Sequence, residues 1–294
     1  MTAAIHIGPD PEEHLVRAVE DGGGQPVALG EAEGVVWAGP PSDLPELPGS
    51  VRWVQLQAAG IEPWIARIRE TPGVQFTSAV GAYATQVAEL ALGLLIAGTR
   101  GFVGYARASS WEPRQERVLQ GSTVAIVGAG AIGRELIAML EPHEVEIVAV
   151  TRSGRDGTLP VERLGEVWGS ADHFVICAPA TDGTRHLVGA SELAAMKPHS
   201  WVVNIARGSL IDTDALVEAL EAEAIGGAGL DVTDPEPLPD GHPLWSSPRA
   251  LITPHVANPP STMARDLAKR VQENVRRFAA GEELIAPVSP DRGY

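Results

Sequence analysis

Several features that define large classes of proteins are scarce or absent in this sequence. The single cysteine, Cys177, excludes an internal disulfide, and no cluster of histidine, cysteine or aspartate has the spacing of metal ligands. Lysine occurs only at positions 197 and 269, and 38 acidic residues face 22 basic ones, so a nucleic-acid partner is not expected. No apolar run approaches the ~18 residues that span a bilayer, and the opening MTAAIHIGPDPEEH lacks the basic and apolar regions of a signal peptide. We therefore expect a cytoplasmic protein without membrane contact.

Short apolar runs alternate with helical patterns along all 294 residues, which is typical of parallel sheets joined by crossover helices. The sequence thus predicts an α/β protein with two Rossmann-like domains built on doubly wound parallel sheets. Strands are expected at 4–7, 27–29, 35–38, 51–55, 74–76, 123–127, 146–150, 173–177, 201–204, 228–231 and 251–253. Helices are expected at 12–19, 83–100, 132–140, 191–196, 214–222 and 261–280, the last capped by Ser261, with loops at 40–50 and in the polar segment 108–120. Cys177 is expected to be a buried strand residue.

Two of these helices organise the chain into domains. The helix at 83–100 is almost wholly small and apolar, so it should be buried on most sides and join the domains. The helix at 261–280 is expected to bring the C-terminus back to the first domain. We predict a discontinuous, flavodoxin-like substrate domain of residues 1–98 and 262–294, and a dinucleotide-binding Rossmann domain of residues 99–261.

A glycine-rich turn joins the expected strand at 123–127 to the helix that follows it. In Gly128-Ala-Gly130-Ala-Ile-Gly133, the first glycine permits a tight turn, the second lets the backbone approach a pyrophosphate, and the third lets helix pack on strand. The N–H groups at the helix start, around Ala131 and Ile132, would face the phosphates. The alternative is an ordinary glycine-rich turn without a ligand. The strand, turn and helix context favours a dinucleotide.

The end of the next strand indicates which dinucleotide. A site for NAD usually places an acidic residue there to bind the ribose hydroxyls, but this chain has Thr151, Arg152, Ser153 and Arg155 instead. Two guanidinium groups and two hydroxyls suit a 2′-phosphate, because arginine donates in a planar fork and keeps its charge. We therefore predict NADP(H) in preference to NAD(H). The alternative is a solvated loop with ordinary surface arginines.

Five further motifs follow the glycine turn. They are 177–184 (CAPATDGT), 196–198 (MKP), 204–212 (NIARGSLID), 229–237 (GLDVTDPEP) and 252–256 (ITPHV). In this order and spacing, the stretch from about Gly121 to His255 resembles the D-isomer-specific 2-hydroxyacid dehydrogenase family. The resemblance is weaker in the N-terminal half, where 57–61 (QAAGI) and 87–90 (VAEL) are the main segments that resemble the family.

The resemblance implies roles for individual residues. Arg207 would bind the carboxylate and carbonyl of a small 2-keto or 2-hydroxy acid, His255 would be the acid/base, and Glu236 would orient His255. Asp231 would contact the nicotinamide carboxamide, and backbone N–H groups at Ala59 and Gly60 would bind the second carboxylate oxygen. The remaining cofactor contacts are expected at Ala178, Pro179, Thr184, Ile205 and Ala206. The family resemblance also implies a homodimer formed through the cofactor domain.

The chemistry of keto-acid reduction fits these residue types. A hydride adds to C2 and a proton to its oxygen, so the site needs an acid that titrates near neutrality, and a neighbouring carboxylate stabilises imidazolium. Arginine offers the bidentate geometry that a carboxylate accepts. Each residue also has a structural alternative: Arg207 in a helix-end salt bridge, His255 packed in a loop, or Glu236 on the surface. The other histidines do not lie in motifs of this kind and are interpreted as structural.

Two rival functions share this fold. Formate dehydrogenases carry an amide where Glu236 stands, so the carboxylate argues against them. A nicotinamide-sensing binding protein, like the corepressors of this fold, would keep Arg207, Glu236 and His255 without significant turnover. The absence of long disordered flanks argues against this function. The chain departs from the family at 79–81 (AVG), at Ala178 and at 257–260 (ANPP), which leaves the identity of the acid open.

Overall fold

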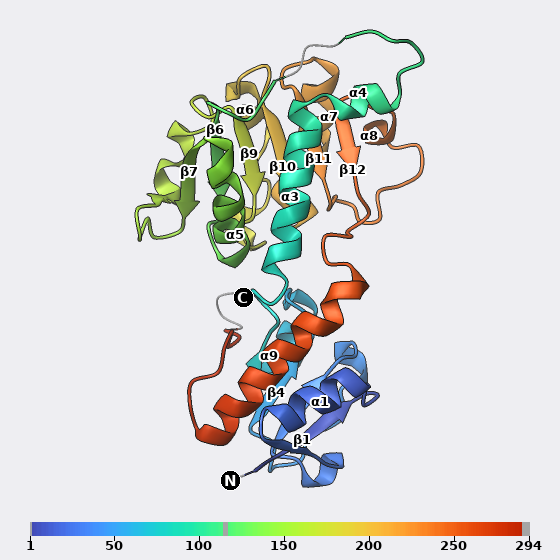
Figure 1. Ribbon diagram of the computed structural model, residues 1–294, viewed down its shortest axis with the longest axis vertical. Coiled ribbons are helices and arrows are strands. Elements are labelled where there is room, and N and C mark those ends of the chain that lie inside the picture. The colour runs from blue at the N-terminus through green and yellow to red at the C-terminus, as the bar shows by residue number, and fades with distance from the viewer. Residues whose placement is uncertain (1, 114–116, 290–294) are drawn as a thin grey trace. The chain divides into compact units, whose positions relative to one another are not determined.

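The computed structural model describes residues 2–113 and 117–289 and shows two compact units (Figure 1). Unit 1 comprises the chain up to Ala84 together with the part from Asn258 onward, and unit 2 comprises Thr85–Ala257. Unit 1 therefore consists of two separate stretches of the chain. The substrate and dinucleotide domains expected with boundaries after residues 98 and 261 stay a prediction. Residues 114–116 of the polar segment 108–120 lie outside the described residues.

Unit 1 is built on a parallel sheet in the order β2-β1-β3-β4-β5. Its strands are β1 (Ala3–Gly8), β2 (Gly24–Pro26), β3 (Gly34–Trp37), β4 (Trp53–Leu56) and β5 (Gln75–Thr77). Helices α1 (Glu13–Asp21) and α9 (Pro260–Ala280) pack against each other, and α2 (Ile65–Arg69) precedes β5. This strand order is that of flavodoxin-like doubly wound sheets, as the sequence predicted.

Two details of unit 1 correct the sequence analysis. The strand expected at 27–29 is observed at Gly24–Pro26. Apolar residues do not mark this edge strand in the sequence, because Gly24 lies too close to Val275 to carry a side chain. Helix α9 is not capped by Ser261. It begins one residue earlier, with Pro260 in its first turn, where the missing proline N–H has no helical partner to lose.

A buried network of polar side chains ties the C-terminal helix of unit 1 to its sheet. Asn274 of α9 donates to Gln55 Oε1 of β4 at 2.7 Å, and Thr77 of β5 donates to the same oxygen at 2.9 Å. Trp53 Nε1 donates to Thr77 Oγ1 at 2.9 Å. Asn274 Oδ1 also accepts the backbone N–H of Ile285. Because buried polar groups are costly without partners, these bonds fix the register of α9 on the sheet.

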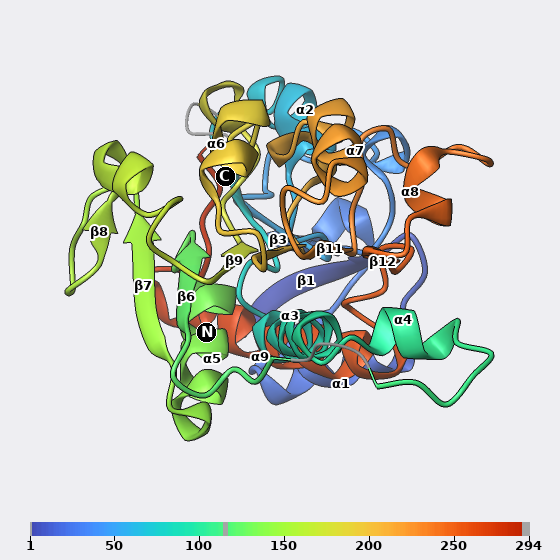
Figure 2. The same ribbon diagram turned by 90° about the horizontal axis from the view of Figure 1, so that it is seen from above.

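Unit 2 contains a parallel sheet in the order β12-β11-β10-β9-β6-β7-β8. Its strands are β6 (Thr123–Val127), β7 (Glu146–Thr151), β8 (Leu159–Pro160), β9 (His173–Ile176), β10 (Trp201–Asn204), β11 (Gly227–Leu230) and β12 (Ala250–Ile252). Its helices are α3 (Ala84–Thr99), α4 (Phe102–Ala106), α5 (Ala131–Leu140), α6 (Ala190–Ala195), α7 (Thr213–Glu221) and α8 (Pro243–Ser246). Figure 2 shows α6 and α7 on one face of this sheet and α3 and α5 on the other.

The central strands of unit 2 form because their residues can be buried on both faces. Strand β6 reads Thr-Val-Ala-Ile-Val, and β9 and β10 are buried along their whole length. Starting from β6, the chain runs outward through β7 and β8, then returns to β9 and continues to β12 on the other side. In such a sheet, ligands bind beyond the carboxyl ends of the strands, beside the point where the order reverses. That point lies between β6 and β9.

Short 3-10 helices occupy several connections between these elements. They lie at Leu29–Glu31, Pro41–Asp43, Glu62–Trp64, Glu141–His143, Val161–Glu166, Asp182–Thr184 and Gly208–Leu210. Among the described residues, no helix is both long enough and apolar enough to cross a membrane.

Candidate active site

The glycine turn leaves the carboxyl end of β6 at the reversal point of the sheet. Gly128 has φ 102°, and a Cβ there would lie 2.5 Å from the backbone nitrogen of Ala178. A Cβ on Gly133 would lie 2.8 Å from the carbonyl oxygen of Gly128, so the start of α5 packs directly on the turn. A Cβ on Gly130, by contrast, would have no neighbour within 4 Å. The turn thus combines two tightly packed glycines with an open one, which fits a pyrophosphate approaching Gly130 and the N–H groups of Ala131 and Ile132.

The arginine loop follows β7 at the same edge of the sheet. Arg152, Ser153 and Arg155 are exposed, whereas Thr151 is half-buried and its hydroxyl accepts the N–H of Gly154 at 3.1 Å. Thr151 therefore shapes the loop from inside. The exposed guanidinium side chains of Arg152 and Arg155 leave the loop basic and suited to a phosphate monoester.

The segment after β9 lies beside the glycine turn. Ala178 is buried against Gly128, and the Thr184 hydroxyl donates to the carbonyl of Pro179 at 2.8 Å, which closes the 3-10 turn between them. Cys177 lies one residue beyond the end of β9 and is half-buried; burial raises the pKa of its thiol to about 12. The expected buried strand position of Cys177 is therefore wrong, since the residue lies just outside the strand and is only partly buried, and its raised pKa disfavours the reactive thiolate.

Arg207 lies on a turn after β10 that the neighbouring side chain of Asn204 holds. Asn204 is buried, donates to the carbonyl of Arg207 at 2.9 Å and accepts the N–H of Ala206 at 3.1 Å; Ile205 precedes that residue and is buried. The next residue, Gly208, packs so closely that a Cβ would lie 1.9 Å from the carbonyl oxygen of Thr233. The arginine turn is therefore pressed against the segment that leads to Glu236.

His255 and Glu236 form a hydrogen-bonded pair. His255 Nδ1 lies 2.6 Å from Glu236 Oε1, and the other carboxylate oxygen accepts the N–H of Thr233 at 3.4 Å. Because an ionised carboxylate only accepts, Nδ1 carries the hydrogen of this bond. Both side chains are about half exposed, His255 by 53% and Glu236 by 43%, so a substrate can reach the imidazole.

Asp231 holds the turn on which His255 sits. Its carboxylate accepts the Thr253 hydroxyl at 2.5 Å and the N–H groups of Val256 and Ala257 at 2.9 and 3.1 Å. Its carbonyl accepts the N–H of His255 at 2.8 Å. Since His255 has φ 52°, a conformation that costs free energy outside glycine, these bonds stabilise the strained turn. The predicted nicotinamide contact of Asp231 stays a prediction.

The structure thus brings Arg207, Asp231, Glu236 and His255 to the carboxyl edge of one sheet, which also carries the glycine turn. The supporting roles of Asn204, Gly208 and Thr253 were not predicted from the sequence. Asn204 bonds the backbone of its own turn, Gly208 packs on the distant backbone of Thr233, and Thr253 bonds the distant side chain of Asp231. Ala59 and Gly60 follow β4 in unit 1, and substrate binding there stays a prediction. Within the described ranges 2–113 and 117–289, no group of His, Cys, Asp and Glu could hold a metal ion.

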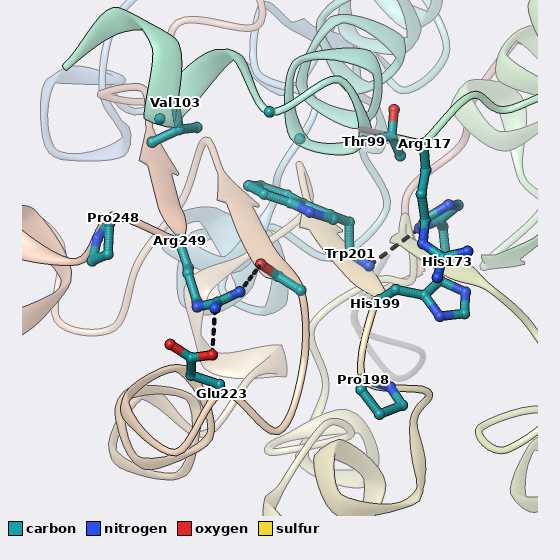
Figure 3. Close-up of a pocket in the computed structure, with 14 residues that line it drawn as sticks. Thr99, Val103, Arg117, His173, Pro198, His199, Trp201, Glu223, Pro248 and Arg249 are labelled. Carbon is teal, nitrogen blue, oxygen red and sulfur yellow. Dashed lines mark hydrogen bonds and ion pairs between the residues drawn. The ribbon is translucent and has the colours of Figure 1, made fainter. Parts of the chain in front are cut away.

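A separate cavity of about 880 Å³ lies at the opposite, amino edge of the same sheet (Figure 3). Trp201, the first residue of β10, lines it together with His173, the first residue of β9, and the Arg249–Glu223 ion pair, whose closest atoms are 2.7 Å apart. It lies at the amino ends of the strands, whereas α/β sheets bind their ligands beyond the carboxyl ends. Burial lowers the pKa of His173 to about 4, and its Nδ1 accepts the N–H of Trp201 at 3.2 Å.

Comparison with known proteins extends the resemblance over the whole chain. The family model described as D-isomer specific 2-hydroxyacid dehydrogenase, NAD binding domain, matches residues 92–257. An uncharacterized protein of the proB 3′ region of Corynebacterium melassecola is 38% identical and covers 96% of this chain and 97% of its own. A glyoxylate reductase of Aeropyrum pernix is 30% identical and covers 79% of this chain and 74% of its own. A crystal structure of a D-isomer specific 2-hydroxyacid dehydrogenase from Xanthobacter autotrophicus Py2, in complex with NADPH and MES, is 25% identical, covers 100% of both chains and has a TM-score of 0.84.

Proposed function

The chain belongs to the D-isomer specific 2-hydroxyacid dehydrogenase family, and on this basis we propose that it uses NADPH to reduce a small 2-keto acid to the 2-hydroxy acid. Membership makes it an NAD(P)-dependent oxidoreductase of 2-keto or 2-hydroxy acids. The observation that carries the finer proposal is the 2.6 Å bond between His255 and Glu236, on the same sheet edge as the Arg207 turn and the glycine turn.

In the proposed mechanism, each residue of the trio has one task. Arg207 binds the substrate carboxylate and the adjacent carbonyl oxygen through its planar guanidinium group. Glu236 holds the imidazole of His255 by its Nδ1–H and stabilises the charged ring. As C2 gains a hydride, the proton on Nε2 of His255 moves to the carbonyl oxygen, so the carbonyl becomes an alcohol and the ring becomes neutral.

The residues around the glycine turn fit a reduced dinucleotide, which supplies the hydride when bound. Gly128 and Gly133 close the turn, and the open space at Gly130 would receive the pyrophosphate beside the N-terminus of α5. The preference for NADPH rests on Arg152 and Arg155, whose exposed guanidinium groups suit a 2′-phosphate. The glyoxylate reductase among the relatives supports an acid of small size.

The test is a kinetic panel on the purified protein. Glyoxylate, hydroxypyruvate, pyruvate, and branched and aromatic 2-keto acids are each mixed with NADPH or NADH, and cofactor oxidation is followed by its absorbance. We expect turnover with at least one small acid and a higher kcat/KM with NADPH than with NADH. A higher value with NADH would contradict the cofactor preference. If no acid of the panel is reduced although NADPH binds tightly, the sensing protein of the same fold becomes the better description.

We also propose that two copies of the chain associate through unit 2. Large apolar side chains are exposed around α4: Phe102 by 51%, Val118 by 60%, and Trp111 completely. Trp245 of α8 is 43% exposed in the same region, where the Arg107 guanidinium donates to the carbonyl oxygens of Trp245 and Ser247. Exposed aromatic side chains are typical of an interface, and a twofold contact uses one such surface twice.

Sedimentation velocity tests this association. We expect the wild-type protein to sediment as a dimer and Trp111→Asp to shift it toward monomer at low concentration, because a charge would be buried in the interface. Val161→Asp is the matched control, since Val161 is also an exposed apolar residue of unit 2 but lies away from α4. A monomeric wild type, or equal behaviour of the two variants, would contradict the proposal.

A further inference from the structure

The loop that carries the two arginines joins two strands that are direct neighbours. At the edge of the unit 2 sheet, β8 lies parallel to β7, with Thr151 opposite Pro160 (Figure 2). Neighbouring parallel strands are normally joined by a dozen or more residues. Here residues 152–158 make the whole connection, and they do so with left-handed backbone at Gly154, Asp156 and Gly157. The loop is therefore tightly folded and needs internal bonds to hold its shape.

Three side-chain hydrogen bonds, linked donor to acceptor, hold the shape of this loop. The N–H of Gly154 donates to Thr151 Oγ1 at 3.1 Å, and the Thr158 hydroxyl donates to the carbonyl of Arg155 at 2.6 Å. Because a carbonyl can only accept, the single hydroxyl proton of Thr158 is used there. The Thr151 hydroxyl must then be the donor in the 2.6 Å bond between the two threonine oxygens. The chain runs in one direction from Gly154 through both hydroxyls to Arg155.

Packing reinforces this arrangement at the centre of the loop. Gly154 has φ 63°, and a Cβ there would lie 2.8 Å from Cδ of Pro160. The loop therefore packs against β8, and the bond between the two threonines joins the end of β7 to the last residue of the loop. Both arginine side chains project from this closed loop into solvent. Their positions depend on backbone that the two hydroxyls fix, since Arg155 supplies the final acceptor of the chain.

We propose that Thr158 is a positioning residue for cofactor choice: its bond with Thr151 preforms the loop that presents Arg152 and Arg155 to the 2′-phosphate of NADPH. This inference rests on the proposed NADPH preference. It assigns Thr151 an internal task in the loop, where sequence analysis expected a direct cofactor contact. A preformed loop loses less conformational freedom when the phosphate binds, and that difference favours the phosphorylated cofactor over the one that lacks it.

Binding of cofactor fragments tests this without turnover. Adenosine 2′,5′-bisphosphate and adenosine 5′-diphosphate are titrated calorimetrically into the wild type, Thr158→Val and Thr158→Ser. Removing one hydrogen bond should weaken the 2′-phosphate ligand by about three- to tenfold in Thr158→Val and leave the diphosphate affinity unchanged. Thr158→Ser keeps the hydroxyl and should retain the wild-type ratio. Thr123→Val is the control, since it removes a hydroxyl at the amino end of β6.

The outcomes distinguish the two proposals. If the wild type binds both ligands equally, the NADPH preference is wrong, and the proposed role of Thr158 is wrong as well. If the wild type favours the 2′-phosphate and Thr158→Val keeps the same ratio, the preference stands and the positioning role is overturned. Thr158→Ala, measured in the same way, serves in place of Thr158→Val if the β-branched variant does not fold. The ratio of the two affinities is the readout, because general loss of stability would weaken both ligands together.

Discussion

Acid should destabilise unit 2 through one buried histidine, His173. Its side chain begins β9, is 1% exposed and accepts the N–H of Trp201 with Nδ1. Burial is the main cause that lowers its pKa from 6.5 to about 4; the charge of Asp172 opposes the shift, and His199 and Arg117 add to it. The ring is therefore neutral in the folded protein at pH values where it would be charged in the unfolded chain.

The sign and size of the effect follow from proton uptake. Between pH 6.5 and about 4 the unfolded chain binds a proton that the folded protein does not, so the free energy of unfolding falls as the pH falls. Each pKa unit corresponds to about 1.36 kcal/mol, so the loss across this window is about 3 kcal/mol. Below the folded pKa both states are protonated, and His173 adds no further slope. Burial of the neighbouring Asp172 opposes a low pKa, but hydrogen bonds from Lys197, Thr123 and His199 hold that pKa well below its usual range. The contribution of Asp172 to the free energy of unfolding is therefore lost only at lower pH than that of His173.

His173→Asn is the informative variant, because the amide oxygen of asparagine can replace Nδ1 as the acceptor while the side chain no longer titrates. Urea unfolding followed by tryptophan fluorescence at several pH values should show a shallower pH dependence for this variant, with about 3 kcal/mol less change than the wild type across the window. His143→Asn, on a 3-10 turn of the same unit, is the control and should keep the wild-type slope. Parallel pH profiles for the wild type and His173→Asn would refute the assignment of the acid sensitivity to His173.

Four further substitutions test the candidate active site. His255→Ala should lower kcat by about 10²- to 10⁴-fold and leave the dissociation constant for NADPH unchanged, as measured by cofactor fluorescence, because the acid is lost and the cofactor contacts stay. Arg207→Ala should raise KM and lower kcat, reducing kcat/KM by about 10- to 100-fold, and an unchanged value would contradict its role. Gly208→Ala should lower Tm and abolish activity because its Cβ would overlap the carbonyl of Thr233, whereas Gly165→Ala, with nothing within 4 Å, should be neutral in both measurements. Thr253→Val removes the 2.5 Å hydrogen bond to Asp231 and should lower kcat by about ten-fold, with intact folding checked by circular dichroism.

The central strands of unit 2 could be predicted closely from the sequence. Strands β6 and β10 begin and end where the apolar runs do, because a strand buried on both faces needs continuous apolar residues. The edge strands β2 and β8 could not be predicted, since Gly-Gln-Pro and Leu-Pro carry little apolar signal. Their position depends on what they pack against: Val275 beside β2, and the folded loop beside β8.

The candidate site divides in the same way. The family resemblance singled out Arg207, Glu236 and His255, and the chemistry of keto-acid reduction fits an arginine, a carboxylate and an imidazole; their catalytic roles stay predictions. The bonds that hold these side chains were not visible in the sequence. Thr253 reaches Asp231 across neighbouring strand ends, and Thr158 reaches Thr151 across a loop, so neither bond is visible until the chain is folded.

The return of α9 to unit 1 has a consequence for the order of synthesis. A ribosome completes β1 to β5 long before it makes Asn274, the residue whose amide binds Gln55 inside that sheet. The whole of unit 2 emerges in between and can fold as soon as it is free, since its residues are continuous in the chain. Until α9 emerges, β1 to β5 lack the bond from Asn274 and α1 lacks its helical neighbour, so unit 1 can be completed only after unit 2 has been made.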